Sequence, residues 1–233
     1  MFYKALSILL LGFFSYSTNT YSDPNSLVTA EVPEVKTTSE ELYLSLNANN
    51  FMLPTRESFV KAIEGFYQLK KEGKIKKEIL TLIDFSKSAN AERMWVIDLA
   101  TNTILYQTLV SHGRNTGNEF ATKFSNIPES FQSSLGFYAT AETYIGKHGF
   151  SLRLDGLEKG INDKARERAI VIHGADYVSD RFISQHGRLG RSLGCPALPR
   201  ELSEEIIKTI QDKSCVFIYY PSENYKTKSQ LVS

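Results

Sequence analysis

Short apolar runs of strand length dominate the chain from residue 94 onward. They are rich in β-branched and aromatic side chains and are separated by turn residues, a pattern typical of β-strands. One segment differs, because apolar residues recur at helical spacing over 201–212, just after Pro199. The strand-like runs span 94–99, 103–110, 136–144, 151–157, 169–175 and 215–220. The pattern predicts a mainly β fold, a mixed sheet or sandwich with one covering helix.

A helical period also precedes the strands. Apolar residues recur at this spacing over 56–71 and again over 75–83, so we expect two packed helices here. The first would bury Phe59, Ile63, Phe66 and Tyr67, and the second Ile75, Ile79, Leu82 and Ile83. An aromatic stripe of this kind favours core packing over a cofactor site.

The N-terminus has the pattern of an export signal. Lys4 precedes an apolar run that is too short to span a bilayer, and small residues follow it at plausible cleavage positions. We expect export to the periplasm or cell envelope, without stable membrane insertion after cleavage; the alternative is an N-terminal membrane anchor. The expected parts are a signal peptide, a flexible leader, an N-terminal helical extension, a main β domain and a polar tail. Their boundaries are 1–22, 23–38, 39–73, 74–222 and 223–233.

Composition and charge exclude several functions. The chain has 233 residues and is 42% hydrophobic, which indicates a globular core. Lys plus Arg number 27 and Asp plus Glu 26, so no global field would attract nucleic acid or an anionic surface. The His and Cys spacings match no common zinc site, and no Gly-rich phosphate-binding motif opens a helix. We therefore expect no metal, no other cofactor and no nucleic-acid partner.

The segment 173–198 concentrates the reactive side chains. Gly194 precedes Cys195 and Pro196 follows it, which favours a tight, fixed turn that displays a thiol near backbone N–H groups. A free thiol, with a pKa of about 8.5, becomes nucleophilic when a neighbouring base removes its proton. The pattern therefore indicates a cysteine nucleophile for acyl transfer.

The base must be chosen among four histidines, each of which is followed by glycine. His173 directly follows an apolar strand run, which would hold its imidazole rigidly near the nucleophile, so we expect His173 to be the base. His186 is the alternative, because it is closer to Cys195 in sequence but lies in a polar segment. His112 and His148 are expected in loops, and either could line the same cleft.

Other residues would support the reaction. The Gly174 carbonyl would fix the tautomer of His173, and N–H groups at Gly194 and Cys195 would bind an oxyanion. A substrate carboxylate suits forked hydrogen bonds from arginine, although a solvated loop or a structural ion pair is the alternative role. The candidate substrate-binding residues are Arg191, Arg188, Ser192, Tyr177 and His186. For Ser192, a local hydrogen bond within the turn is at least as good an interpretation.

A disulfide is the competing interpretation of the two cysteines. In an exported protein, a Cys195–Cys215 bond is the default structural role for two cysteines and would leave a noncatalytic module. Cys215, however, opens the apolar run 215–220, where a thiol behaves as a small buried hydrophobe. We therefore expect Cys195 to be free.

These residues resemble the catalytic signature of murein L,D-transpeptidases of the YkuD-like superfamily, in its divergent second branch. The resemblance rests on His173 together with R-S-L-G-C-P-A-L, which ends at Leu198. It extends over about 74–220 through the segments D-F-S-K-S, S-S-L-G-F-Y, E-T-Y-I-G-K-H-G and S-L-R-L-D-G-L-E.

The resemblance implies a β-rich domain whose Cys195 attacks the amide on the carboxyl side of the L-centre of diaminopimelate in a tetrapeptide stem, releasing D-alanine. An acceptor amine would then form a 3→3 crosslink, whereas water would make the protein a carboxypeptidase or endopeptidase. Peptidoglycan stem peptides are thus the expected partners. With a Cys195–Cys215 disulfide, the alternative is a noncatalytic wall-binding module. The better-known branch has a histidine two residues before the cysteine, where this chain has Leu193. That departure supports His173 as the base.

Overall fold

The computed structural model describes residues 38–232, which belong to one compact unit. The expected signal peptide (1–22) lies outside the described residues, as does the expected leader (23–38) except for Thr38. Within the described part of the chain, no helix is long and apolar enough to cross a membrane.

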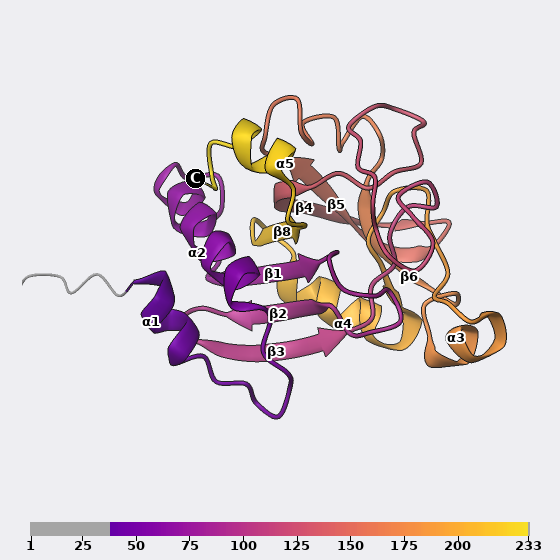
Figure 1. The fold of residues 1–233 in the computed structure, drawn as a ribbon, viewed down its shortest axis with the longest axis horizontal. Coiled ribbons are helices and arrows are strands. Elements are labelled where there is room, and N and C mark those ends of the chain that lie inside the picture. The colour runs from indigo at the N-terminus through magenta and orange to yellow at the C-terminus, as the bar shows by residue number, and fades with distance from the viewer. Residues whose placement is uncertain (1–37, 233) are drawn as a thin grey trace, which may run out of the picture. The chain divides into compact units, whose positions relative to one another are not determined.

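Eight strands form one mixed sheet in the order β3-β2-β1-β8-β4-β5-β6-β7, which confirms the mainly β fold (Figure 1). The strands are β1 (Ile79–Asp84), β2 (Met94–Asp98), β3 (Thr103–Thr108), β4 (Gly136–Gly146), β5 (Gly149–Gly156), β6 (Val171–Ala175), β7 (Ala197–Pro199) and β8 (Cys215–Tyr219). Neighbours are antiparallel except for the pairs β1–β8 and β6–β7, which are parallel. Because β6 and β7 run in the same direction, the chain between them must return across the molecule.

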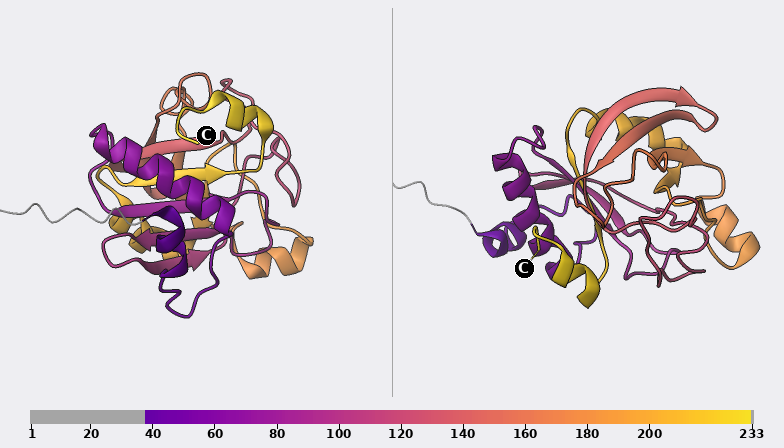
Figure 2. Two further views of the ribbon diagram at one scale, coloured as in Figure 1. Left: turned by 60° about the vertical axis from the view of Figure 1, so that its left-hand side comes forward. Right: turned by 90° about the horizontal axis from the view of Figure 1, so that it is seen from above.

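The sheet curls into a nearly closed barrel. Its two edge strands, β3 and β7, are joined where the chain just beyond β3 bridges β7, because the Ser111 N–H donates to the Ala197 carbonyl at 2.9 Å. The curvature is clearest from above, where the strands of the β4–β5 hairpin are strongly bent (Figure 2). Closure brings the segment after β3 beside the loop that precedes β7.

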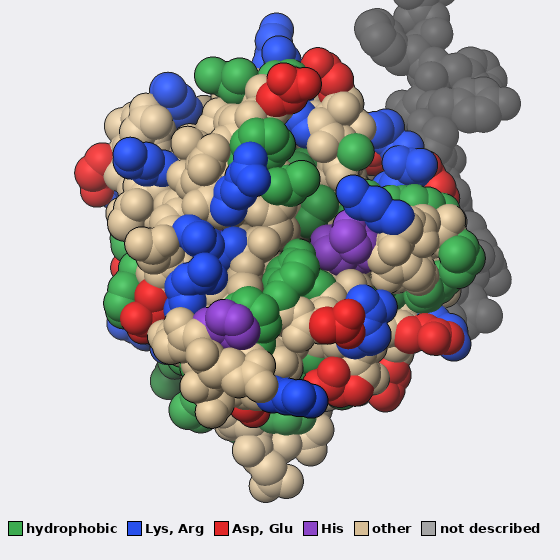
Figure 3. Space-filling model, turned by 90° about the vertical axis from the view of Figure 1, so that its right-hand side faces the viewer, with side chains coloured by type: hydrophobic (Ala, Val, Ile, Leu, Met, Phe, Trp, Pro, Cys, Tyr) green, Lys and Arg blue, Asp and Glu red, His purple; other side chains and the backbone are tan. Residues whose placement is uncertain are grey.

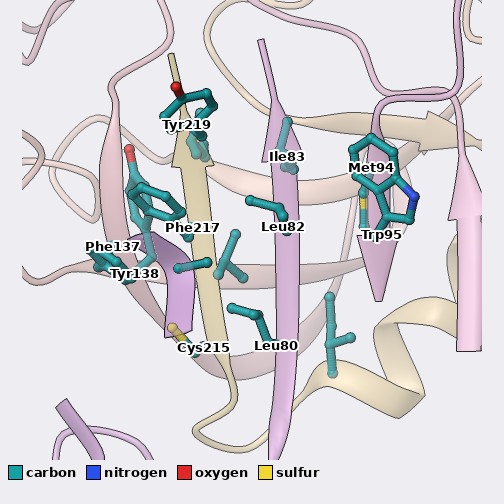
Figure 4. Packing of buried hydrophobic residues seen from close by; sticks show 14 of the residues in the cluster. Leu80, Leu82, Ile83, Met94, Trp95, Phe137, Tyr138, Cys215, Phe217 and Tyr219 are labelled. Carbon is teal, nitrogen blue, oxygen red and sulfur yellow. The ribbon is translucent and has the colours of Figure 1, made fainter. Parts of the chain in front are cut away.

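The core lies on both faces of the central strands. From Leu80 onward β1 is fully buried, as is all of β8, so neither strand alternates between buried and exposed positions (Figure 4). The buried residues of β1 include the polar Thr81 and Asp84. Phe137 of β4 stacks on Phe217 of β8 with ring centroids 4.1 Å apart. This pairing fixes the middle of the sheet.

Helices cover the sheet from different sides. They are α1 (Ser39–Leu44), α2 (Arg56–Lys71), α3 (Asp180–His186), α4 (Arg200–Ile210) and α5 (Glu223–Lys228). The helices expected over 56–71 and 201–212 are present, with α2 packed on β1 and β8 and α4 packed on β5, β6 and β7. Tyr67 departs from the expected buried face of α2, since 41% of it is exposed, whereas Phe59, Ile63 and Phe66 are buried.

The prediction of a second helix over 75–83 is wrong. Ile75 is buried in a loop, and the segment from Ile79 forms β1, which pairs with β2 and, in parallel, with β8. A short apolar run in the middle of a sheet is buried on both faces, so its periodicity resembles that of a buried helix. Its strand partners lie far away in sequence, and local spacing does not reveal them.

The C-terminal segment, expected as a polar tail, forms α5 and buries Tyr225, Leu231 and Val232. The buried carboxylate of Glu158 holds it, accepting hydrogen bonds from the Tyr225 hydroxyl at 3.0 Å and the Ser229 hydroxyl. The Phe137 N–H donates to the same carboxylate at 2.7 Å. Glu158 therefore joins the C-terminal segment to β4.

Candidate active site

Cys195 lies in the loop that enters β7, against the first residues of β6. Its Sγ accepts the N–H of Val171 at 3.5 Å, and the thiol is directed at the Ala169 carbonyl at 3.7 Å. Cys195 is partly exposed and Cys215 is buried in β8; both are free thiols, so the disulfide alternative has no support in the structure. In the parallel pairing of β6 and β7, His173 lies opposite Ala197. Cys195 precedes Ala197 by two residues and therefore lies beside Val171, two residues before His173 on β6.

Ser192 shapes the turn that carries the nucleophile. Its hydroxyl donates to the Cys195 carbonyl at 2.6 Å and accepts the Gly194 N–H at 3.1 Å. The Ser192 N–H donates in turn to the His112 carbonyl at 2.9 Å, in the segment brought over by barrel closure. Because Gly194 donates to Ser192, its N–H is not available to an oxyanion. Among the hydrogen bonds of residues 38–232, the Cys195 N–H has no acceptor, so it is the donor that remains.

Gly194 has to be glycine for two reasons. Its φ is +128°, a backbone conformation that side chains disfavour. A Cβ at this position would also lie 2.9 Å from the Gln132 carbonyl oxygen and 3.1 Å from Cδ1 of Ile170. The Ser133 hydroxyl donates to the Gly194 carbonyl at 3.1 Å, which holds the turn from below.

His173 has the geometry of a neutral base. It is only 2% exposed, and its Nδ1 lies 3.0 Å from the Gly174 carbonyl, which requires the proton on Nδ1 and leaves the Nε2 lone pair free. Burial lowers the pKa of His173, and the Gly174 carbonyl partly opposes this effect. A Cβ on Gly174 would lie 3.2 Å from Cα of Arg200, so the strand and α4 can meet only at a glycine.

His148 also belongs to this site. It lies with Lys147 in the tight turn of the β4–β5 hairpin, and its ring stacks on that of His173 with centroids 4.2 Å apart and planes 20° apart. Burial lowers the pKa of His148, and the nearby charge of Lys147 lowers it further. The sequence placed His148 in a loop that could line the cleft; the structure adds its contact with His173.

The thiol is un-ionised at rest. Burial raises the pKa of Cys195, whereas the Val171 N–H, Arg168 and Lys147 act in the opposite direction. Tyr177 lies in the same environment, since burial raises its pKa to about 12 and the Cys195 charge adds to the effect. The thiol of Cys195 and the imidazole of His173 are therefore both neutral near pH 7.

The two candidate arginines hold loops. Nη1 of Arg191 donates to the carbonyls of Arg114 and Gly117, at 3.2 and 3.1 Å, and to Oδ1 of Asn118 at 2.7 Å. Nη1 of Arg188 donates to the Leu189 carbonyl at 2.9 Å. Both guanidiniums thus donate to loop carbonyls, and among residues 38–232 neither forms the structural ion pair given as the alternative. Forked binding of a substrate carboxylate stays a prediction.

The other two histidines have partners of their own. His186 is exposed at the end of α3, where it stacks on Phe182 with centroids 4.0 Å apart. His112 is fully buried, and its Nδ1 accepts from Nη2 of Arg93 at 2.8 Å while its Nε2 donates to the Gly117 carbonyl. Burial and the Arg93 charge lower the pKa of His112 to about 4. Among residues 38–232, neither histidine forms a hydrogen bond with Cys195.

Sequence reasoning missed Arg168, which lies beside the nucleophile turn and is bound to the loop 125–134. Only its place shortly before the strand of His173 could have indicated it. Figure 3 shows the face that carries this region: histidine side chains lie on either side of a shallow hollow lined by hydrophobic groups, with lysines and arginines around it.

Comparison with known proteins identifies the class. The family model described as the L,D-transpeptidase catalytic domain matches residues 54–219, so the chain belongs to this family. This confirms the resemblance found in the sequence, and it associates the protein with a family of enzymes that act on peptidoglycan. The match begins before α2, so it includes the larger part of the expected N-terminal helical extension. No curated protein matches the chain significantly.

Solved structures give weaker similarities. An L,D-transpeptidase from Mycobacterium smegmatis is 12% identical over 61% of this chain and 59% of its own, with a TM-score of 0.38. The helical cell shape determining protein Pgp2 from Campylobacter jejuni is 15% identical over 70% and 57%, with a TM-score of 0.42. L,D-transpeptidase 3 from Mycobacterium tuberculosis is 11% identical over 61% of each chain, with a TM-score of 0.39. The chain thus spans about six tenths of the length of these proteins.

Proposed function

We propose that this protein is an exported L,D-transpeptidase that acts on peptidoglycan stem peptides through a thioester on Cys195. One observation carries the proposal. The free, partly exposed thiol of Cys195 lies beside Val171 of β6, and two residues further along β6 the Gly174 carbonyl holds the Nδ1 proton of His173. Membership in the L,D-transpeptidase catalytic domain family supplies the substrate class.

The first half-reaction forms the acyl-enzyme. Nε2 of His173 takes the proton of the Cys195 thiol, and Sγ attacks the carbonyl carbon on the carboxyl side of the diaminopimelate L-centre. The Cys195 N–H donates to the oxyanion that develops, a contribution typically of about 3 kcal/mol. Collapse of the tetrahedral intermediate breaks the C–N bond, and His173 returns its proton to the departing D-alanine amine.

The second half-reaction resolves the thioester. The side-chain amine of a neighbouring stem attacks the carbonyl, its proton passes to His173, and the Cys195 thiolate leaves and is reprotonated. This forms a 3→3 crosslink. If water attacks instead, the product is a trimmed stem, and the protein is an L,D-carboxypeptidase.

Thiol proton transfer requires the Cys195 side chain to turn toward His173. In the described structure the thiol is directed at the Ala169 carbonyl rather than at His173. Catalytic hydrogen bonds commonly tighten only in the substrate complex, so rotation of the Cys195 side chain would complete the pair.

The direct test incubates purified protein with tetrapeptide-stem muropeptides and identifies the products by mass spectrometry. A 3→3 dimer with release of D-alanine supports transpeptidation, whereas release of D-alanine without dimer supports the carboxypeptidase. Cys195→Ala should abolish both products. The matched control is Cys215→Ala, which removes the other thiol far from solvent and should leave activity in the folded protein.

A further inference from the structure

Arg168 is bound to a single loop by all the hydrogen bonds of its guanidinium. Nη1 donates to the Ser125 carbonyl at 2.8 Å and the Ser134 hydroxyl at 2.6 Å, and Nη2 donates to the Gln132 carbonyl at 2.5 Å and the Ser130 hydroxyl at 3.3 Å. The guanidinium is half-buried. Such a fork fixes both the arginine and the loop 125–134.

Arg168 has no counter-ion. Among residues 38–232, no carboxylate oxygen lies within ion-pair distance of its guanidinium, whereas nearby Arg166 and Arg200 each pair with a carboxylate. Holding a charge away from water with only neutral acceptors is costly, and burial accordingly lowers the pKa of Arg168. Loop stability alone therefore does not explain why a positively charged side chain without a counter-ion occupies position 168.

The nucleophile turn packs directly on this guanidinium. A Cβ on Gly194 would lie 3.5 Å from Nη2 of Arg168, on the side where the Gln132 carbonyl also approaches. The Ser133 hydroxyl, from the loop that Arg168 holds, donates to the Gly194 carbonyl at 3.1 Å. The charge and the loop thus lie together beneath the backbone of Gly194 and Cys195.

Four other groups complete the environment of the thiol. Lys147 approaches from the β4–β5 turn, His173 lies on β6, Tyr177 follows β6, and the Val171 N–H donates to Sγ. Lys147 is exposed, and His173 and Tyr177 are neutral near pH 7. Of the two cations near the thiol, Lys147 and Arg168, it is Arg168 that hydrogen bonds hold in place.

We propose that Arg168 is a positioning residue that keeps a positive charge beneath the Cys195 turn, stabilising the thiolate and fixing the turn through the loop 125–134. The proposal rests on the proposed function, in which Cys195 is the nucleophile. Thiol ionisation can nevertheless be measured without any peptidoglycan, so the two can fail separately.

The first test measures alkylation of Cys195 by iodoacetamide from pH 6 to 10, with the modified residue identified by mass spectrometry. Arg168→Gln should slow alkylation at pH 7.5 by roughly three- to tenfold and move the pH profile to higher pH, because the thiolate loses its cation. Arg168→Lys keeps the charge but loses the fork, so it should slow alkylation less than Arg168→Gln does. Arg166→Gln, which removes an exposed and ion-paired arginine two residues away, should leave the profile unchanged.

A second pair of variants leaves Arg168 intact. Ser130→Asp introduces a carboxylate where the hydroxyl now lies 3.3 Å from Nη2, so it should neutralise the charge, slow alkylation and lower activity. Ser130→Asn is the uncharged control of similar size and should behave like the wild type. If Arg168 only braces the loop, the new ion pair would strengthen the brace and alkylation would not slow.

The Ser130 pair decides the question if Arg168→Gln does not fold. Slower alkylation in Ser130→Asp than in Ser130→Asn supports the proposal, and equal rates overturn it. A folded Arg168→Gln variant with the wild-type alkylation profile also overturns it. The proposed function, by contrast, fails if Cys195→Ala still forms products from muropeptides.

Discussion

At the scale of single residues, the site depends on protons and charges held in fixed places. His173 is kept neutral by burial and oriented by the Gly174 carbonyl, while Cys195 is kept un-ionised by burial. Activity should therefore depend on pH through the protonation of a neutral His173 and a neutral Cys195 thiol, and not of a resting ion pair.

The acid limb of the activity profile should report His173. Its pKa is lowered, so the imidazole stays unprotonated below its ordinary range, and activity should fall only at more acidic pH than an unperturbed histidine would give. His148→Ala removes the ring that covers His173 and its share of that lowering, so the limb should move to higher pH. The measurement is kcat/KM from pH 4.5 to 8, with His186→Ala as the exposed-histidine control. An unmoved limb in His148→Ala would contradict this role of the stack.

The turn itself should depend on Ser192. Ser192→Ala removes the acceptor of the Gly194 N–H and the donor to the Cys195 carbonyl in a buried place. The free energy of unfolding should fall by about 1–2 kcal/mol, since a buried donor loses its partner. Urea denaturation measures this loss, and activity should fall further than stability explains because the nucleophile shifts. Full activity with native stability would show that the turn holds without this hydroxyl.

At the scale of elements, the sequence predicts most of the architecture and part of the site. The strand runs and the helices over 56–71 and 201–212 are local patterns, so they could be predicted. The segment 75–83 could not, because β1 is distinguished from a helix only by its pairing with distant strands. The helix α3 was missed because none of its residues is buried, which leaves no apolar stripe to detect.

The site follows the same division. His173 and Cys195 could be selected because a strand end and a glycine turn are visible in sequence. The loop role of Arg191 and the place of Arg168 depend on which carbonyls the fold brings within reach, and on these the sequence is silent. The contact of His148 with His173 requires the β4–β5 hairpin to arch over β6, which is a tertiary property.

The attachment of α5 can be tested at one phenol. Tyr225→Phe removes a hydroxyl that donates to the buried Glu158 carboxylate, so the free energy of unfolding should fall by about 1–2 kcal/mol in urea denaturation. Burial raises the pKa of Glu158, so the folded state favours its protonated form. The resulting contribution to the free energy of unfolding is complete below the pKa that Glu158 has in the unfolded chain, and it is lost as pH rises through the folded pKa. Removing a donor to the ionised form should therefore cost more at pH 7 than at pH 4. An equal cost at both pH values would contradict this account.

At the scale of the whole molecule, barrel closure assembles the site. The bridge from Ser111 to Ala197 joins the two sheet edges and brings His112 and Gly113 under the Ser192 turn. The loop 125–134 supports the same turn from another side, because its Ser133 hydroxyl donates to the Gly194 carbonyl. Arg168 holds this loop in place. Segments from across the chain thus converge on one sulfur atom, and the central claim is that this atom carries the acyl group.

Intact-protein mass spectrometry during reaction with a tetrapeptide-stem donor tests that claim most directly. We expect a transient adduct with the mass of the donor less D-alanine, located on Cys195 by peptide mapping and retained longer when no acceptor amine is present. Cys195→Ala should show no adduct, and Cys215→Ala should show the wild-type one. A donor that is turned over without any adduct on Cys195, or with the same adduct in Cys195→Ala, would contradict the account.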